Sequence, residues 1–280
     1  MGKQVAFSFL FSGIPTSDIA GFCNRLLSRT IFPFWLKPCW KKAWCVENAG
    51  GSRSRGGIRH RSRLAAGVMK VNELFYSIQG ESSFAGRPCA FIRLTGCNLR
   101  CAWCDTQYAF FEGTEMSVPE IIRAIDAYPT RLALVTGGEP MLQKDVHELF
   151  ATLIDRGCTV LLETGGHEPL AAVDARVHKI VDFKCPSSGM SGRNDYANAG
   201  CLTRNDEVKF VIADRNDFEW ACGLVRKFDL TARAGTVHFS PVFGTVHFAE
   251  LAAWILECGL DVRMQPQLHK IIWPETSRGV

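Results

Sequence analysis

Three cysteines lie close together in residues 96–106, and their spacing suits inorganic chemistry. Cys97, Cys101 and Cys104 form the pattern Cys-x3-Cys-x2-Cys directly after residues 90–94, an apolar run that reads as a β-strand. Thiolates this close on one loop can bind one inorganic centre, because the backbone between them is too short to send their side chains apart. Three cysteines on a [4Fe-4S] cluster leave one iron without a protein ligand, and that iron can bind a reactant. The spacing therefore predicts an iron-sulfur cluster that takes part in chemistry.

A zinc site and a chance grouping of cysteines are the alternatives to a cluster. A structural zinc site closes with a fourth Cys or His, and none lies within the forty residues after Asp105, the first histidine being His147. A disulfide framework is not expected without a secretory context. Most of the remaining cysteines sit singly in apolar surroundings, where cysteine acts as a small core residue. They include Cys89, Cys158, Cys185, Cys201, Cys222 and Cys258.

The charge of the chain is divided unevenly. Residues 1–70 carry 12 Lys and Arg against 2 Asp and Glu, whereas residues 71–280 carry 20 against 26. The second part is mildly acidic, so its charge does not indicate nucleic acid as a partner. With 280 residues and 47% hydrophobic content, the chain can bury one full core, and we expect one catalytic domain of about 200 residues.

The N-terminal part shows no regular hydrophobic period. Its apolar run, residues 5–14, is shorter than the ~20 residues of a membrane span, and no clean cleavage site of a signal or transit peptide follows. Residues 49–66 are rich in Gly, Ser and Arg, which predicts a solvated, disordered linker rather than a nucleic-acid-binding arm. Met69 stands directly before the first well-patterned strand. We therefore expect residues 1–69 to be a disordered or artefactual extension and residues 70–280 to be the catalytic domain.

After Met69, short β-type runs alternate with helix-type segments, as in a parallel βα architecture. Six or seven βα repeats in about 200 residues are too few for an eightfold barrel, so we predict an incomplete, open TIM-like barrel. Ligands should gather where its strands end. The predicted strands are residues 70–75, 90–95, 132–136, 159–163, 179–184, 208–212, 237–240 and 260–264.

The helices between these strands have readable ends. Ser117 with Glu120 three residues later predicts a capping box. A helical stripe of apolar residues begins at Leu142, continues to Leu153 and stops before Gly157. Two further helices are predicted at residues 218–228 and at residues 248–258, the latter ending at Gly259.

Four predicted strand ends carry the candidate motifs, namely residues 97–106, 137–140, 163–166 and 184–189. Gly137 and Gly138 would let the backbone approach a ligand closely, although Gly-Gly alone more often means a turn. Lys184 is either a ligand contact or a surface lysine after a core strand.

The cluster loop, with Trp103 just before its last cysteine, is similar to that of the radical S-adenosylmethionine (SAM) enzymes. Residues 76–81 (Tyr-Ser-Ile-Gln-Gly-Glu), the pair Asp105-Thr106 and residues 267–270 (Gln-Leu-His-Lys) narrow the match. Together they resemble the 7-carboxy-7-deazaguanine synthase family. The resemblance runs from about Lys70 to Trp273.

The resemblance implies a [4Fe-4S] cluster whose open iron chelates SAM, together with the open-barrel fold. The loop of Gly137 and Gly138 resembles the radical SAM motif that meets the methionyl amino group. Many members have Ser-Pro where this chain has Asp182-Phe183, so Lys184 transfers best. The implied SAM contacts are Trp103, Cys104, Asp105, Gly138, Asp182, Phe183, Lys184 and Ser240.

A second layer of residues is implied around the substrate. Gln79 and Glu81 offer donors and acceptors to the guanine-like edge of a pterin, but by themselves would be ordinary surface residues. Arg93 lies inside a strand, where a substrate carboxylate or an internal salt bridge would compensate its charge. His269 either faces the substrate or packs in an apolar run. The implied substrate contacts are Ile78, Gln79, Gly80, Glu81, Arg93, Thr136 and His269.

Thr106 is implied to be a ligand of Mg²⁺, since its hydroxyl is a hard oxygen ligand; from the sequence alone it would be a helix N-cap. No residue is assigned as acid or base. The implied reaction converts 6-carboxy-5,6,7,8-tetrahydropterin to 7-carboxy-7-deazaguanine with loss of ammonia, in queuosine and 7-deazapurine biosynthesis. Its implied setting is a cytoplasmic homodimer reduced by a flavodoxin or ferredoxin, without nucleic acid or membrane. The alternatives are an activating enzyme for a glycyl-radical protein and a zinc-stabilised binding module.

Overall fold

The computed structural model describes residues 67–273 and 278–280, and all of its strands join one sheet. The expectations for residues 1–66 lie outside these residues. The elements follow in the order β1 (Val68–Ile78), β2 (Pro88–Leu94), the 3-10 helix η1 (Gln107–Phe110), β3 (Thr114–Ser117), α2 (Val118–Ile125), β4 (Leu132–Gly137), η2 (Pro140–Leu142), α3 (Val146–Asp155), β5 (Thr159–Thr164), β6 (His178–Asp182), η3 (Pro186–Ser188), η4 (Ser191–Arg193), η5 (Tyr196–Cys201), β7 (Glu207–Ile212), α4 (Arg215–Lys227), α5 (Leu230–Arg233), β8 (Thr236–Pro241), α6 (Phe248–Cys258), β9 (Arg263–Met264) and α7 (Leu268–Ile272).

The sheet has the order β3-β1-β2-β4-β5-β6-β7-β8-β9 and does not close, because β3 and β9 are its two edges. From β2 to β9 every neighbouring pair is parallel, while β1 runs antiparallel to both β2 and β3. The predicted open βα barrel is therefore confirmed. The edge strand β3 was not predicted, and β1 begins at Val68, two residues before the expected domain boundary.

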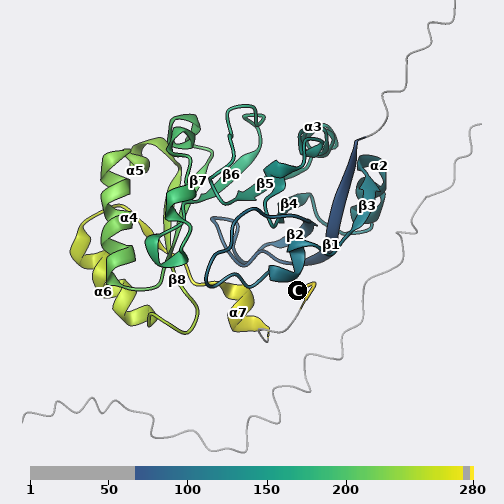
Figure 1. The fold of residues 1–280 in the computed structure, drawn as a ribbon. Helices are drawn as coiled ribbons and strands as arrows, with labels where there is room; N and C mark the ends of the chain where they lie inside the picture. Colours follow the sequence, from purple (N-terminus) through teal and green to yellow (C-terminus); the bar gives the residue numbers. More distant parts are fainter. Residues whose placement is uncertain (1–66, 274–277) are drawn as a thin grey trace, which may run out of the picture. The chain divides into compact units, whose positions relative to one another are not determined.

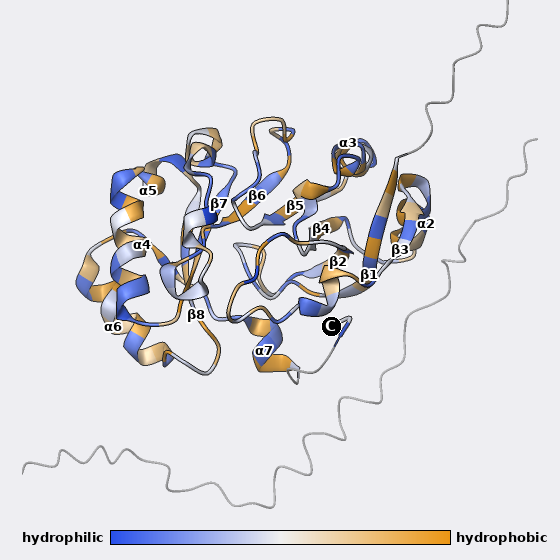
Figure 2. Cartoon of the chain, in the orientation of Figure 1, coloured by the Kyte–Doolittle hydropathy of each residue, from blue (hydrophilic) through white to orange (hydrophobic). Residues whose placement is uncertain are grey.

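Side chains alternate between two faces along each strand, since successive residues of a strand point in opposite directions. Figure 1 shows α2 to α6 on the outside of the curved sheet, and Figure 2 shows that these helices carry both apolar and polar residues. Their apolar residues, such as Ile121 of α2 and Phe218 of α4, belong to the core cluster that packs against the strands. On β7, Val208 and Phe210 join this outer core, while Lys209 and Val211 line the inside of the barrel. The alternation decides which residues of each strand can meet a ligand.

The predicted helix ends are largely confirmed. Glu120 accepts hydrogen bonds from both the backbone nitrogen and the hydroxyl of Ser117, at 2.8 and 2.6 Å. Gly259 ends α6 with φ of +65°, a conformation that favours glycine. The start of α3 was wrong, because Leu142 lies in η2 and extended backbone at Gln143 separates it from Val146.

Two strands also end or begin elsewhere than predicted. β6 ends at Asp182 rather than at residue 184, and β9 contains only Arg263 and Met264.

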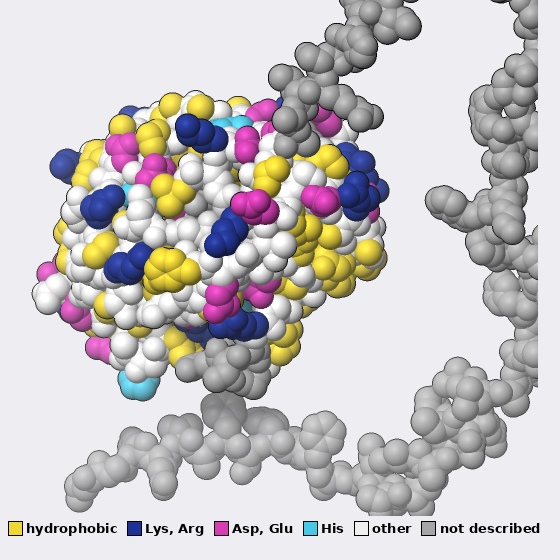
Figure 3. All heavy atoms as spheres, turned by 45° about the vertical axis from the view of Figure 1, so that its right-hand side comes forward, with side chains coloured by type: hydrophobic (Ala, Val, Ile, Leu, Met, Phe, Trp, Pro, Cys, Tyr) yellow, Lys and Arg dark blue, Asp and Glu magenta, His cyan; other side chains and the backbone are white. Residues whose placement is uncertain are grey.

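No helix in residues 67–273 or 278–280 combines the length and hydropathy needed to cross a bilayer. On the face in Figure 3, the side chains of Lys and Arg are interspersed with those of Asp and Glu.

Candidate active site

A cavity of about 840 Å³ opens inside the barrel, and strands from both halves of the sheet line it. The predicted contacts that line it are Ile78, Gln79, Gly80, Glu81, Arg93, Cys97, Cys101, Trp103, Cys104, Asp105, Thr106, Thr136, Gly138, Asp182, Lys184 and His269. The fold thus brings together motifs that are almost two hundred residues apart in the sequence. Phe183 and Ser240 are absent from this lining.

The three cysteines face the cavity from a loop that hydrogen bonds hold at its start and in its middle. Ahead of the loop, Gly96 donates to the Ala109 carbonyl at 2.9 Å, and within it Ala102 donates to the Ser188 carbonyl at 3.1 Å. Each of the three cysteines is half-buried and has a free thiol. Burial raises the pKa of Cys97 and Cys101, as expected for thiols away from water.

The loop after β4 touches the cluster loop so closely that no side chain fits between them. A Cβ on Gly138 would lie 2.2 Å from the Gly96 carbonyl oxygen and 2.7 Å from the Cys97 Cβ. Gly137 has φ of +153°, and a Cβ there would lie 2.2 Å from the Leu94 carbonyl oxygen. The two glycines are therefore required by close backbone approach, not by a turn alone.

Glu139, the next residue, ties this loop to the one after β5. Its buried carboxylate accepts hydrogen bonds from Met141 N at 3.1 Å, Gly165 N at 2.8 Å and the Thr164 hydroxyl at 2.9 Å. Burial raises the pKa of Glu139, and these hydrogen bonds offset only part of that effect. The carboxylate is thus a structural brace for two loops that line the cavity.

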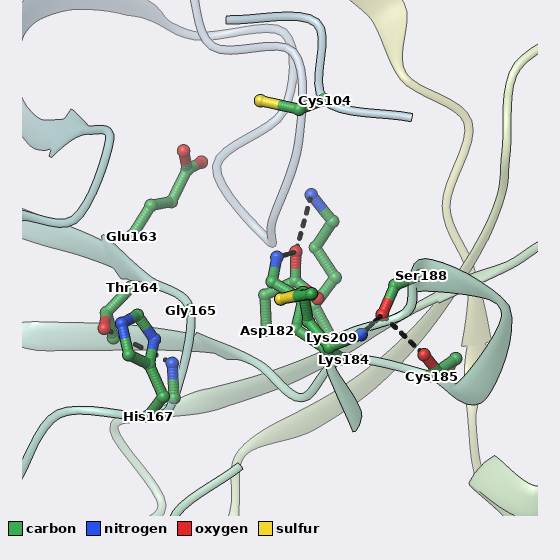
Figure 4. A network of polar contacts seen from close by, with 12 residues as sticks. Cys104, Glu163, Thr164, Gly165, His167, Asp182, Lys184, Cys185, Ser188 and Lys209 are labelled. Carbon is green, nitrogen blue, oxygen red and sulfur yellow. Dashed lines mark hydrogen bonds and ion pairs between the residues drawn. The ribbon is translucent and has the colours of Figure 1, made fainter. Parts of the chain in front are cut away.

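Asp182 lies between two lysines at the cavity wall (Figure 4). Its Oδ2 is 2.8 Å from Nζ of Lys184 and 4.0 Å from Nζ of Lys209. Burial opposes the charge of both lysines, but nearby carboxylates outweigh it and raise their pKa values. The second oxygen, Oδ1, is buried and has no hydrogen-bond partner among the described residues, so it is available to a ligand.

Two predicted SAM contacts are not supported by their side chains. Phe183 points to the outer face of the sheet, where it is 1% exposed and packs against Tyr196 and Phe210. Alternation explains this, because its neighbour Asp182 points inward. Ser240 is fully buried and does not line the cavity.

On the substrate side, Gln79 and Glu81 are buried, contrary to the surface alternative. Glu81 forms a close ion pair with Lys209 and accepts a 2.5 Å hydrogen bond from Nε2 of Gln267. Burial by itself would raise the pKa of Glu81, but Lys209 and His269 lower it to about 2. Nε2 of Gln79 is buried without a hydrogen-bond partner in the part of the chain that the structure describes. The pair thus presents a fixed anion and a free amide donor.

Arg93 and His269 also reach the cavity, with different partners. Nε of Arg93 lies 2.6 Å from Oε1 of Glu73, so the salt-bridge alternative is realised, although both residues still line the cavity. His269 packs against Gly80, where a Cβ would lie 2.4 Å from its Nδ1. Burial lowers the pKa of His269, and the carboxylate of Glu81 offsets only part of that effect.

The sequence placed Glu163 in a candidate strand-end motif without a role and did not single out Lys209, although both line the cavity. Glu163 accepts a hydrogen bond of 3.1 Å from the Thr136 hydroxyl. Burial, reinforced by the charge of Glu81, raises the pKa of Glu163 to about 7. The signal for both residues was a charged side chain on the inward-facing positions of an otherwise apolar strand, the same signal that singled out Arg93.

Comparison with known proteins places this geometry in a family. Residues 91–252 match the model of the radical SAM superfamily. The 7-carboxy-7-deazaguanine synthase of Koribacter versatilis (strain Ellin345) is 45% identical over 226 residues, which cover 76% of this chain and 100% of that protein. The synthase of Chlorobaculum tepidum is 46% identical over 216 residues, covering 76% and 97%.

The chain belongs to the 7-carboxy-7-deazaguanine synthase family of radical SAM enzymes. The crystal structure of QueE from Escherichia coli has the same fold, with a TM-score of 0.60 over 71% of this chain and 94% of that chain at 23% identity. As in the superfamily, the cofactors of this synthase-family chain are a [4Fe-4S] cluster and SAM.

The residues present fit these cofactors. Three free thiols from one short loop face one cavity. That arrangement suits three corners of a cluster better than the tetrahedron of a zinc site. Beside the thiols, the glycine-lined loop and the free oxygen of Asp182 leave polar groups for a cofactor of the size of SAM.

Proposed function

We propose that this chain converts 6-carboxy-5,6,7,8-tetrahydropterin into 7-carboxy-7-deazaguanine with loss of ammonia, in the biosynthesis of queuosine and other 7-deazapurines. The name of its relatives supports the product. The observation that carries the proposal is that the cluster thiols share one cavity with Gln79 and Glu81. A guanine-like edge carries N–H groups for an ionised carboxylate and an acceptor for the free amide.

The residues of the chain orient the substrate and exclude water from it. Cys97, Cys101 and Cys104 would hold the cluster, and SAM bound to it would supply the radical chemistry of the reaction. Glu81 is kept ionised by Lys209, so it accepts hydrogen bonds at the pH of the cell. Thr136, Arg93 and His269 surround the same space, and a rigid surround lowers the entropic part of the barrier.

We further propose that Thr106 binds the Mg²⁺ that holds the substrate carboxylate. Thr106 occupies the N-cap position of η1, but its side chain makes no capping hydrogen bond. Its hydroxyl lies 3.8 Å from the Cys104 sulfur and lines the cavity. Thr106→Val keeps the shape and removes the oxygen ligand. We expect the variant to cleave SAM while losing the Mg²⁺ dependence of product formation.

The reaction needs a reductant, and we propose a flavodoxin or ferredoxin. A homodimer in the cytoplasm is proposed on the family resemblance. We also propose that the catalytic domain comprises residues 70–280, preceded by an extension that catalysis does not need.

A rival function is the activation of a glycyl-radical protein. Such an enzyme has no use for Gln79, Glu81 and His269 inside a cavity, so binding of a small pterin in the absence of any protein partner separates the two functions.

The decisive test uses the full chain with its cluster reconstituted anaerobically. Reduced protein, SAM, Mg²⁺ and 6-carboxy-5,6,7,8-tetrahydropterin should yield 7-carboxy-7-deazaguanine, detected by mass, with SAM recovered after turnover. Glu81→Gln should still cleave SAM without substrate but lose most product formation. Wild-type protein that cleaves SAM and leaves the pterin unchanged would rule the proposal out.

A further inference from the structure

The loop that joins β1 to β2, residues 79–87, contacts the first residues of β6, β7 and β8, and we call it the floor loop. Its ends are joined by hydrogen bonds of 2.8 Å between Gln79 N and the Arg87 carbonyl and between Gly86 N and the Gln79 carbonyl. Phe84 packs against the inner apolar cluster, edge-on to His178 at 5.0 Å. The first residues of this loop, Gln79 to Glu81, are those that line the active-site cavity.

Strand β7 holds the floor loop at two points with matching spacing. Lys209 pairs with Glu81, and Glu207, two residues earlier on the strand, accepts a hydrogen bond from Ser83 N at 3.1 Å to each carboxylate oxygen. Residues two apart on a strand point to the same face, so both contacts come from the inner face of β7. Glu207 and Lys209 thus contact Ser83 and Glu81, which are also two residues apart.

Glu207 is itself held by two histidines from the neighbouring strands. Nε2 of His178 on β6 lies 2.9 Å from Oε1, and Nε2 of His238 on β8 lies 2.6 Å from Oε2. Glu207 and His238 are each 1% exposed. Burial would raise the pKa of Glu207, but the bonds from the histidines outweigh it and keep the pKa well below its usual range. Each histidine therefore fixes one carboxylate oxygen of Glu207, and the carboxylate stays oriented toward Ser83.

We propose that Glu207, held by His178 and His238, is a positioning residue that fixes the floor loop so that Gln79 and Glu81 face the substrate. It acts through Ser83, and neither Glu207 nor Ser83 lines the active-site cavity. This role of Glu207 rests on the proposed function only because the proposed function identifies the ligand as a pterin. Ordering of the loop by Glu207 can be measured without any turnover.

Asp206 offers a matched control for Glu207. It is the adjacent residue, is also a fully buried carboxylate, and forms an ion pair of 2.9 Å with Lys179 on the outer face of the sheet. Its side-chain partners, Lys179 and Thr203, lie outside the floor loop. Asp206→Asn and Glu207→Gln therefore remove one buried charge each, and only the second disturbs the loop.

The first measurement is hydrogen exchange on the reconstituted full chain without substrate. In Glu207→Gln, an NH2 group replaces one carboxylate oxygen and cannot accept the hydrogen bonds that this oxygen accepted. Peptides that cover residues 79–87 should therefore exchange at least about tenfold faster. In Asp206→Asn these peptides should exchange as in wild type. His238→Asn keeps the Ser83 contact but frees the carboxylate, and an intermediate effect is expected.

The second measurement separates KM from kcat. In Glu207→Gln the KM for 6-carboxy-5,6,7,8-tetrahydropterin should rise by about tenfold or more, because substrate must then order the loop. SAM cleavage in the absence of substrate should stay unchanged. Two outcomes would overturn the proposal: equal changes of KM and of floor-loop exchange in Glu207→Gln and Asp206→Asn, or unchanged exchange of the floor loop in Glu207→Gln. A wild-type enzyme inactive on the pterin would instead refute the proposed function and leave the exchange result to decide the role of Glu207.

Discussion

The hydroxyl of Thr136 at the end of β4 donates a hydrogen bond of 3.1 Å to Oε2 of Glu163 on β5, inside the cavity. Burial of the Glu163 carboxylate, reinforced by the negative charge of Glu81, raises the pKa of Glu163 to about 7. Two neighbouring carboxylates in one cavity thus have pKa values of about 7 and about 2, because Lys209 pairs with Glu81.

The raised pKa of Glu163 predicts how stability depends on pH. Its pKa in the folded protein lies above the value of 4.5 for an unperturbed glutamate, so the folded state binds the proton more tightly between about pH 4.5 and 7. The contribution of Glu163 to stability therefore falls as the pH rises through this window. Glu163→Gln removes the effect, so Tm of the variant minus Tm of wild type should increase from about pH 5 to about pH 8. A difference that stays constant or decreases would contradict the assignment.

Replacing one cysteine of the triplet should remove the cluster without unfolding the barrel. Cys101→Ser is expected to lose the broad absorption near ~400 nm and SAM cleavage, since serine does not replace a thiolate on iron. Cys158→Ser, a half-buried cysteine away from the active-site cavity, is the control and should keep both. Iron analysis after anaerobic reconstitution provides the measurement. Full iron content in Cys101→Ser would refute the ligand assignment.

A methyl group on Gly138 should push the loop after β4 away from the cluster loop. The Cβ would lie 2.2 Å from the Gly96 carbonyl oxygen, so the backbone must shift. We expect Gly138→Ala to weaken SAM binding at least about tenfold while the far-UV circular dichroism stays unchanged. Gly192→Ala, where a Cβ meets nothing within 4 Å, should bind SAM as wild type does. Equal affinities in calorimetric titrations of the two variants would contradict the close approach.

A chain that starts at Met69 should keep catalysis, because β1 then loses only Val68, which is 54% exposed. Met69 itself is 1% exposed and pairs with Met116 on β3, so the strand keeps its packing. We expect Tm within about 3 °C of the full chain and equal kcat. Loss of activity on truncation would show that the preceding residues serve the reaction.

Local chemistry was readable from the sequence because it depends on neighbours in the chain. The spacing of Cys97, Cys101 and Cys104 predicted the cluster, the Ser117 and Glu120 pair predicted the start of α2, and Gly259 predicted the end of α6. The alternation of strands and helices predicted an open barrel, since six or seven βα units cannot close it.

Only the tertiary structure decided which distant side chains meet. Ser83 lies 124 residues from Glu207, and Glu81 lies 128 residues from Lys209, so their contacts depend on how the floor loop crosses the barrel. The register of β1 and β2 likewise gave Arg93 its partner Glu73. At the end of β6, Asp182 points into the cavity while the next residue, Phe183, points into the core. Sequence spacing determines what is near along a chain, whereas strand register and the face of each strand determine what is near across a sheet.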